Sequence, residues 1–205
     1  MAFTSCSNYA QGYFNVYKEL AARSDLDAIL HLGDYIYEYQ NIEASLTTGR
    51  VHCPAQETVS LQDYRQRHAC YKSDADLQAV HRQHVFLVIW DDHEVANNAW
   101  RGGAESHGTA SSWPQRLSAA VQAYLEWMPV RESTDQTMSL YRDFRFGDLL
   151  QLNLLDTRLA GRDQPAHELA ERDQPQRTFL GKEPESWLEQ SLQTATQPGV
   201  VRKVL

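Results

Sequence analysis

Two largely apolar runs of the chain each lead directly into acidic residues. The run 28–33 precedes Asp34, and the run 85–90 precedes the cluster Asp-Asp-His-Glu at 91–94. Continuous apolar runs of this length are typical of strands buried on both faces of a sheet. The carboxyl ends of such strands meet at the edge of an open α/β sheet, where ligands bind. The pattern therefore predicts an α/β fold with two acidic clusters on one edge, which favours hard metal ions and hydrolysis.

The rest of the first half alternates between expected strands, helices and loops: a strand at 2–6, a helix at 13–23, a loop at 39–57, a helix from Ser60 to His68 and a helix at 77–84. Segment 13–23 has apolar residues at helical spacing, and Ser60 is a favourable N-cap. Segment 39–57 has no clear period, so we expect a loop beside the first acidic cluster. The helices before the run 85–90 complete a βαβ pattern.

The second half predicts a long helix, a hairpin and a final strand: a helix from Ser112 to Trp127, strands at 140–146 and 149–155, a surface segment at 160–176, a helix at 184–195 and a strand at 200–205. Pro114 in the first turn favours the start of the long helix. Gly147 and Asp148 form a two-residue connection that suits a tight hairpin turn.

Length and composition limit the function classes. A chain of 205 residues with 42% hydrophobic residues predicts a single globular unit with one substantial core. The 19 basic and 27 acidic residues give a net charge of −8, which argues against binding of nucleic acid or an anionic membrane by bulk charge. No segment has the length and apolar character of a membrane span, and the amino terminus lacks the pattern of a signal peptide.

Three cysteines leave at least one thiol without a partner in the chain. Cys53 and Cys70 lie in one polar region and could pair in an oxidising compartment. Together with His52 and His68 they could also form a zinc site, although their spacing matches no familiar zinc motif. Both alternatives stay open at the level of the sequence.

Asp34 follows Gly33 at the end of the first apolar run. A carboxylate in this position can bridge two metal ions, because it has two oxygens and the glycine lets the backbone turn away beneath the site. The alternative is that Asp34 caps the next turn, which is a common use of aspartate. The residue alone does not decide between the two.

The second cluster is more specific, because polar groups follow the apolar run without a gap. Asp92, His93 and Glu94 place an oxygen ligand, an imidazole and another carboxylate at one loop tip. Burial of such groups is costly without partners, so metal binding or proton transfer explains them better than a solvated acidic loop. Asn97 and Asn98 add amide oxygens within reach, although asparagine is also common in turns.

Six motifs occur in order along the chain: Phe-Thr-Ser-Cys at 3–6, His-Leu-Gly-Asp-Tyr-Ile-Tyr-Glu-Tyr at 31–39, Leu-Gln-Asp-Tyr-Arg at 61–65, Trp-Asp-Asp-His-Glu-Val-Ala-Asn-Asn at 90–98, Asp-Thr-Arg at 156–158 and Arg-Thr-Phe-Leu-Gly at 177–181. Together they resemble the PhoD-like alkaline phosphatases, and the Trp-Asp-Asp-His-Glu element is a specific signature. The resemblance extends over nearly the whole chain. It implies that residues 1–205 are the N-terminal part of a calcineurin-like metallophosphoesterase domain.

The resemblance implies an incomplete four-layer α/β/β/α sandwich, in which two mixed sheets pack face to face with helices outside. It also implies a centre of Fe(III) and Ca(II), with other divalent metals as alternatives. By motif, Cys6 and Tyr37 correspond to ligands of the iron. Asp34 corresponds to the bridging carboxylate, and Asp92 to the ligand on the calcium side. Thiolate and phenolate suit a ferric ion, and carboxylate oxygen suits calcium.

The implied activity is hydrolysis of phosphate monoesters and diesters by a metal-activated hydroxide. Asp34 and His93 are the expected catalytic residues, and His93 would stabilise charge or protonate the leaving oxygen. Alternatively, His93 has a structural role and is held by Glu94 or Asp91.

Asn97 and Arg158 are the expected substrate-binding residues. The planar guanidinium of Arg158 suits the oxygens of a phosphoryl group. An ion pair of Arg158 with Asp156 or Asp163 is an equal alternative.

The chain departs from the resemblance in its extent. Members of the family continue beyond the position of Leu205 with further metal ligands, so we expect a fragment or a truncated reading frame. Two hypotheses follow: a phosphoesterase when the protein is intact, or an inactive half-domain that retains partial metal binding. An unpaired apolar strand at 200–205 would favour truncation, because such an edge invites pairing with missing chain. The family also implies a periplasmic or secreted location, and the oligomeric state stays open.

Overall fold

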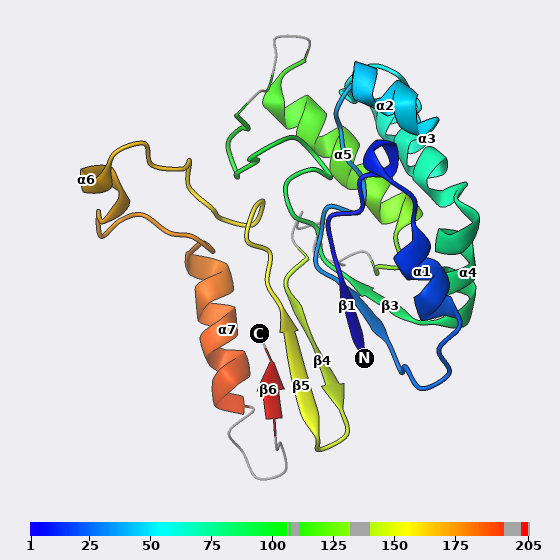
Figure 1. Cartoon of the computed structure of the whole chain (residues 1–205). Helices are drawn as coiled ribbons and strands as arrows, with labels where there is room; N and C mark the ends of the chain where they lie inside the picture. The colour runs from blue at the N-terminus through cyan, green and yellow to red at the C-terminus, as the bar shows by residue number, and fades with distance from the viewer. Residues whose placement is uncertain (106, 108–110, 132–139, 195–201, 205) are drawn as a thin grey trace. The chain divides into compact units, whose positions relative to one another are not determined.

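The structure is a computed structural model that describes residues 1–105, 107, 111–131, 140–194 and 202–204 (Figure 1). Its contacts divide the chain into two units, Met1–Asn98 with Ala104–Gln136 and Ala99–Gly103 with Thr137–Leu205. The length of the chain predicted one globular unit, whereas the structure forms two. Each unit has a three-stranded sheet of its own, and this separates their contacts.

The first unit is built on a parallel sheet in the order β1 (Ala2–Thr4), β2 (Ile29–His31) and β3 (Phe86–Val88) (Figure 1). Leu30 in the middle of β2 lies opposite Phe3 on one side and Leu87 on the other. All residues of β2 and β3 are buried, as expected for apolar runs covered on both faces. The parallel sheet predicted from the two runs is confirmed. Its strands are shorter than the runs, because the chain turns early into the loops that carry the acidic clusters.

The helices described in this unit are η1 (Tyr9–Gln11, a 3₁₀ helix), α1 (Asn15–Ala21), α2 (Glu43–Thr48), α3 (Leu61–Lys72), α4 (Ala75–Gln83) and α5 (Trp113–Trp127). The helices predicted at 13–23, at 77–84 and after Ser112 are confirmed, with ends that differ by one or two residues. Helix α2 lies inside segment 39–57, which the sequence predicted to be a loop. Its six residues are too few to show a helical period.

Helix α3 begins with a reciprocal cap. The Ser60 hydroxyl accepts a hydrogen bond from the backbone N–H of Asp63 (3.2 Å), and the Asp63 carboxylate accepts one from the N–H of Ser60 (2.9 Å). The predicted start is therefore confirmed. The helix continues past its predicted end at His68 because its buried face extends to Tyr71.

A buried arginine fixes the loop that follows β2. Arg67 on α3 is inaccessible to solvent and donates to backbone carbonyls of four residues in two loop segments: Tyr37, Tyr39, Pro54 and Gln56. A buried guanidinium requires acceptors, and these carbonyls supply them. Segments 37–39 and 54–56 are thereby held against α3, which positions the residues after Asp34.

The second unit contains β4 (Arg142–Phe146), β5 (Leu150–Leu154), β6 (Arg202–Val204), α6 (Leu169–Arg172) and α7 (Lys182–Thr194). Strands β4 and β5 are antiparallel, with Phe144 opposite Leu152, and Gly147 at the turn has a φ of +54°. The predicted hairpin is confirmed. The side chain of Gln151 on β5 bonds to the Ser191 hydroxyl of α7 (2.7 Å), which ties this helix to the sheet.

The resemblance implied two mixed sheets, and the described strands show a mixed sheet in the second unit only. The described strands of the first sheet are all parallel, whereas the second sheet is mixed because β6 runs parallel to β5. The strand expected at 200–205 is described at 202–204, paired with β5 along one side, and residues 200, 201 and 205 lie outside the described residues. The surface segment 160–176 includes the short α6. Among the described residues, no helix has the length and apolar character needed to cross a membrane.

Candidate metal centre

The parallel strands deliver the residues that follow them to one edge of the first sheet. Cys6 follows β1, Asp34 follows β2, and Asp91 begins the cluster after β3. The backbone N–H of Cys6 donates to the carbonyl of Gly33 (3.1 Å), and that of Ser7 donates to the carbonyl of Asp34 (2.9 Å). These bonds join the loops after β1 and β2 directly. The edge predicted from the two acidic clusters is present, and it also contains Cys6.

Gly33 is required where the loops after β2 and β3 touch. Its φ is +109°, and a Cβ at this position would lie 2.4 Å from the backbone nitrogen of Asp91. Only glycine avoids both the strain and the collision. The predicted role of Gly33, a turn of the backbone beneath the acidic site, is consistent with this geometry.

Two candidate ligands have a left-handed backbone. Cys6 has a φ of +56° and Asp34 a φ of +55°, values that residues with a side chain rarely adopt. Such conformations cost on the order of 1–3 kcal/mol and persist where the surrounding structure fixes them. Here the two backbone hydrogen bonds between the loops hold both residues in place.

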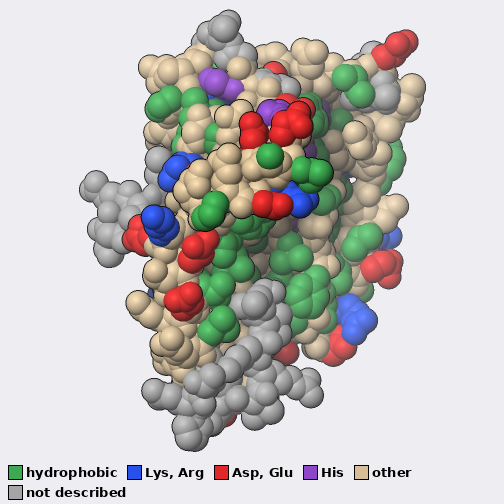
Figure 2. All heavy atoms as spheres, turned by 90° about the vertical axis from the view of Figure 1, so that its left-hand side faces the viewer, with side chains coloured by type: hydrophobic (Ala, Val, Ile, Leu, Met, Phe, Trp, Pro, Cys, Tyr) green, Lys and Arg blue, Asp and Glu red, His purple; other side chains and the backbone are tan. Residues whose placement is uncertain are grey.

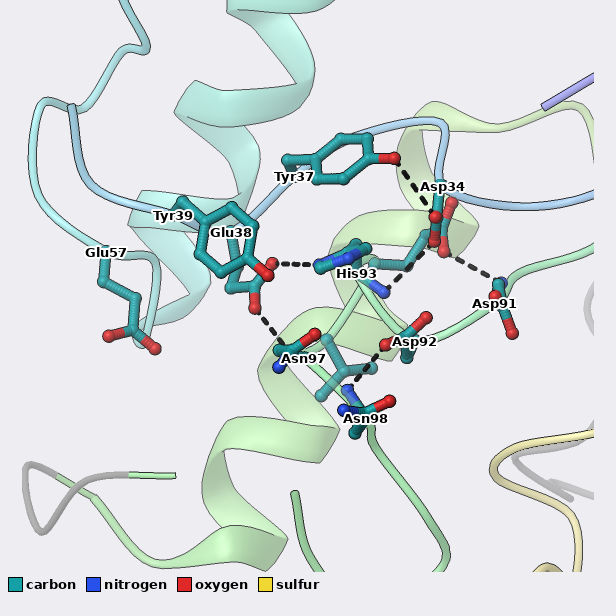
Figure 3. Close-up of polar contacts among 12 residues, drawn as sticks. Asp34, Tyr37, Glu38, Tyr39, Glu57, Asp91, Asp92, His93, Asn97 and Asn98 are labelled. Carbon is teal, nitrogen blue, oxygen red and sulfur yellow. Dashed lines mark hydrogen bonds and ion pairs between the residues drawn. The ribbon is translucent and has the colours of Figure 1, made fainter. Parts of the chain in front are cut away.

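The carboxylate of Asp34 is the point on which other donors converge (Figure 3). Its Oδ2 accepts hydrogen bonds from the Tyr37 hydroxyl (3.2 Å) and the Cys6 thiol (3.5 Å). Its Oδ1 faces the other way, toward the backbone N–H of His93 (3.4 Å). The two oxygens therefore serve different neighbours, which is the arrangement that a bridging carboxylate needs. The bridging role of Asp34 stays a prediction.

Asp92 and His93 complete the cluster. Ligand atoms of Asp34, Asp92 and His93 all lie within 4.8 Å of one another, the one such group of three among the described residues. Asp92 is buried, and its Oδ2 accepts a hydrogen bond from the backbone N–H of Asn98 (2.6 Å). Figure 3 shows both aspartates and His93 facing a common space.

The alternative zinc site at His52, Cys53, His68 and Cys70 is not formed by the described residues. His52 instead stacks on Tyr71, with ring centroids 5.9 Å apart, and His68 stacks on Trp127 at 6.3 Å. Cys53 and Cys70 are separate free thiols. Both histidines are thus packing residues of the first unit.

Glu38 holds His93. Its Oε2 lies 2.8 Å from Nδ1 of His93, and its Oε1 accepts a hydrogen bond from the backbone N–H of Asn97 (2.5 Å). Burial alone would lower the pKa of His93, but the hydrogen bond and the charge of Glu38 outweigh it and raise that pKa to about 9. The sequence suggested Glu94 or Asp91 as the residue that holds His93. The structure shows Glu38 in this position instead. Nothing in the local sequence pairs residue 38 with residue 93, because the contact depends on how two loops fold together.

Two tyrosines pack against the His93 ring. Tyr37 stacks on it with ring centroids 4.3 Å apart, and Tyr39 meets it edge to face at 5.0 Å. Tyr39 is 39% exposed, so one side of this aromatic group faces solvent. The ring orientation of His93 is thus fixed by packing as well as by Glu38.

Glu94 ties the two acidic loops together beneath the site. Its carboxylate accepts hydrogen bonds from the backbone N–H of Tyr35 (2.5 Å) and of Asp91 (2.9 Å), which follow Asp34 and precede Asp92 in the chain. The side chain is inaccessible, and burial, with a smaller contribution from Asp34, raises its pKa to about 8. Glu94 therefore sets the spacing of the two aspartates rather than offering itself as a ligand.

Burial shifts the protonation of the candidate ligands. It raises the pKa of Asp34, and the neighbouring His93 partly opposes this increase. Burial and the charge of Asp34 raise the pKa of Tyr37 far above its usual value. Without a cation, the Tyr37 hydroxyl thus keeps its proton and donates a hydrogen bond to Asp34.

The two expected substrate-binding residues lie in different units. Asn97 is in the first unit, and its side-chain amide donates to Glu105 (3.0 Å). Arg158 is in the second unit, where its backbone N–H donates to Asp156 (3.0 Å). The alternative ion-pair partner Asp163 pairs with Arg101 (3.2 Å). The roles of Asn97 and Arg158 in substrate binding stay predictions.

The donor set fits a cation at this edge. Asp34 and Asp92 are two carboxylates that are both less than 10% exposed and close together, and such a pair is costly without a positive charge or donors. Cys6 and Tyr37 add a sulfur and an oxygen that already point to Asp34. To bind a metal ion, both groups would have to lose the protons that they now share with Asp34.

Comparisons with known proteins agree with the motifs. The model of the PhoD-like phosphatase family matches residues 1–199. Alkaline phosphatase D of Bacillus subtilis (strain 168) is 44% identical over 205 residues, which cover 95% of this chain and 35% of the relative. A solved structure described as "Structure of PhoD" matches with a TM-score of 0.86 and 42% identity, over 95% of this chain and 39% of that chain. The chain thus spans about a third of the length of the curated relative.

Proposed function

Since the chain belongs to the PhoD-like phosphatase family, we propose that it provides the metal-binding core of an enzyme that hydrolyses phosphate monoesters and diesters. The activity is that of the whole protein, because the chain covers only part of its relatives. One observation carries the proposal: the Cys6 thiol and the Tyr37 hydroxyl both point to one oxygen of Asp34, and ligand atoms of Asp92 and His93 lie within 4.8 Å of that carboxylate.

In this proposal Cys6, Asp34 and Tyr37 would hold a ferric ion. Asp92 would hold a calcium ion, with Asp34 as a ligand that both ions could share. A thiolate and a phenolate suit iron, whereas calcium takes about six to eight oxygens, so part of the calcium ligands comes from outside this cluster. When bound, the metal ions supply Lewis acidity that polarises the phosphoryl group and favours the deprotonation of water.

His93 is the proposed proton donor to the leaving oxygen. Glu38 raises its pKa to about 9, so the imidazole keeps a proton into the alkaline range. The stacked Tyr37 ring and the Glu38 carboxylate fix its orientation. A positioned acid whose pKa lies near the working pH is the most effective proton donor.

We further propose that Asn97 and Arg158 contact the phosphoryl oxygens of the substrate, which would be a small phosphoester. The whole protein would have the four-layer α/β/β/α sandwich of the metallophosphoesterases. The structural match to a solved PhoD chain supports this arrangement at the level of the fold.

The activity is tested with p-nitrophenyl phosphate and its bis ester at alkaline pH. We expect the whole protein to hydrolyse both, and to lose activity on chelation of metals and in Asp34→Asn. Asp25→Asn is the matched control, because Asp25 is exposed and pairs only with the exposed Arg23 in the described structure. Unchanged turnover in Asp34→Asn would remove this residue from the mechanism.

A second candidate is a metal-binding unit without turnover. The observation that favours it is the small number of oxygen donors in the cluster of Asp34, Asp92 and His93. Metal binding by this chain with no hydrolysis of either ester, under conditions in which the Bacillus subtilis relative is active, would support this candidate over the enzyme.

A further inference from the structure

A cationic cavity lies in the second unit, formed by the end of α6 and by the chain before and after this helix. Its volume is about 410 Å³. Eight residues line it: Arg162, Asp163, Pro165, Ala166, Arg172, Arg177, Thr178 and Phe179. Three of these are arginines and one is an aspartate. The cavity belongs wholly to the second unit, whereas Asp34, Asp92 and His93 belong to the first.

One wall of the cavity combines an arginine with an aromatic ring. The guanidinium of Arg162 lies over the ring of Phe179, with 4.8 Å between its central carbon and the ring centroid. A guanidinium at this distance from an aromatic ring is attracted to the ring face by a cation–π interaction. Phe179 is 56% exposed, although burial of an aromatic ring is favourable. A large apolar side chain is thus presented to solvent next to a positive charge.

The other two arginines are anchored at one point each. Arg177 donates from Nη2 to the carbonyl of Gln164, and Arg172 donates from Nε to Asp173 (3.0 Å). A guanidinium has five N–H groups, so one anchor orients it without exhausting its donors. Planar donors of this kind match the oxygens of phosphate.

The acidic residue of the lining is already engaged. Asp163 accepts hydrogen bonds from Arg101 (3.2 Å) and from the backbone N–H of Thr178 (2.9 Å). Figure 2 looks onto the side of the molecule that carries α6 and shows basic, acidic and hydrophobic side chains close together there. In a chain with a net charge of −8, a lining of three arginines and one compensated aspartate is a local exception.

We propose that this cavity binds the anionic group of an organic phosphate ester. The arginines contact the phosphate oxygens, and Phe179 packs against the organic group. The cavity is large enough for such a ligand, since small-molecule sites begin at about 300 Å³. The same phosphate ester group occurs in a free ester and within a longer phosphodiester chain. Binding of the longer chain involves more charges, so its affinity falls more steeply with salt.

The test uses the chain after chelation of metals, so that the metal centre cannot hold phosphate. Binding of phenyl phosphate, inorganic phosphate and benzyl alcohol is measured by titration calorimetry. We expect phenyl phosphate to bind most tightly, inorganic phosphate more weakly, and benzyl alcohol not at all. Tighter binding of a short phosphodiester oligomer, with a steeper loss of affinity in salt, would identify the polymer as the source. Equal affinity for the oligomer and phenyl phosphate would identify the free ester.

Substitutions in the lining test whether the ligand binds in this cavity. Arg172→Ala with Arg177→Ala should weaken the binding of phenyl phosphate by about tenfold or more, since each removes charge-assisted hydrogen bonds. Phe179→Leu should weaken phenyl phosphate but leave inorganic phosphate unchanged. Arg145→Ala is the control, because Arg145 is also an exposed arginine of the second unit and pairs with Asp148. The side chains of Arg172 and Phe179 are exposed and that of Arg177 is half-buried. Circular dichroism checks that each variant keeps its fold.

Two results would overturn the proposal. One is the absence of saturable binding of phenyl phosphate to the metal-free chain, and the other is equal affinity in the double variant and the Arg145→Ala control. Neither result depends on hydrolysis, so a failure here is distinct from a failure of the proposed enzyme activity.

Discussion

The two sheets of the molecule carry charge in different ways. In the parallel sheet β2 and β3 are fully buried, and Asp34, Asp92 and Glu94, which follow them, are buried as well. In the mixed sheet β4 alternates between half-buried and exposed positions, and its unit pairs charges at the surface, as in Arg145 with Asp148. The first arrangement needs specific partners for each carboxylate, whereas the second uses water.

This difference indicates where substitutions of charged residues should lower stability most. Around the first sheet, the carboxylates of Asp34, Glu38 and Glu94 each accept hydrogen bonds from other segments of the chain. Loss of one leaves buried donors without acceptors. In the second unit the corresponding ion pairs are exposed, so their loss is compensated by solvent.

The largest effect is expected for Cys6→Ser on iron binding. Cys6 and Cys53 are both exposed free thiols, but only the Cys6 thiol points to Asp34. We expect Cys6→Ser to lower the affinity for ferric iron at least about 100-fold, since even indirect partners of a metal change it by about 10- to 100-fold. Metal content after dialysis measures this, with Cys53→Ser as the matched control. Equal iron content in both variants would remove Cys6 from the centre.

A large loss of stability is expected for Glu94→Ala. Two backbone N–H groups, of Tyr35 and Asp91, would lose their buried acceptor. The free energy of unfolding should fall by about 3 kcal/mol, because each unsatisfied buried donor costs about 1–3 kcal/mol. Chemical denaturation measures this. Glu126→Ala, at a surface pair with Arg65, should change stability much less. A similar change in the free energy of unfolding in both variants would contradict the claim that buried acids contribute more to stability than exposed ones.

An intermediate effect concerns the pH dependence that Glu38 gives to His93. The pKa of His93 in the folded chain, about 9, lies above its usual value of 6.5. The interaction with Glu38 therefore contributes stability that is fully present below pH 6.5 and is lost as the pH rises through about 9. In the metal-free chain, a titration of the imidazole by NMR should give about 9, and Glu38→Gln should lower this value. Glu57→Gln is the control, because Glu57 pairs with Arg116 instead. An unchanged pKa in Glu38→Gln would contradict the assignment of the pair.

The smallest effect is expected for Arg145→Ala in the second unit. The pair of Arg145 with Asp148 is exposed and its atoms lie 3.3 Å apart. Its loss should change the free energy of unfolding by less than about 1 kcal/mol. Thermal denaturation at low and high salt measures this. A loss as large as that in Glu94→Ala would show that the second unit also depends on individual charges.

The strands and their acidic ends were predictable from the sequence because their signals are local. Apolar runs fix β2 and β3, and Ser60 with Asp63 fixes the start of α3. The candidate ligands Cys6 and Tyr37 were assigned through the motifs, and the structure brings both to Asp34.

The remaining features depend on contacts between distant segments. Glu38 reaches His93 across 55 positions, and Glu94 reaches the backbone of Tyr35 across 59. Such contacts leave no periodic pattern in the sequence. The division into two units also escaped prediction, because a hydrophobic content for the whole chain does not show how the core is divided.

The central claim is that Tyr37 and Cys6 hold iron together with Asp34. Tyr37 and Tyr39 both flank His93, but only the Tyr37 hydroxyl reaches Asp34. The most direct measurement is the visible spectrum of the chain loaded with ferric iron. The account predicts a charge-transfer band from phenolate to iron that is lost in Tyr37→Phe and retained in Tyr39→Phe. A colourless iron-loaded chain, or a band that survives in Tyr37→Phe, would contradict it.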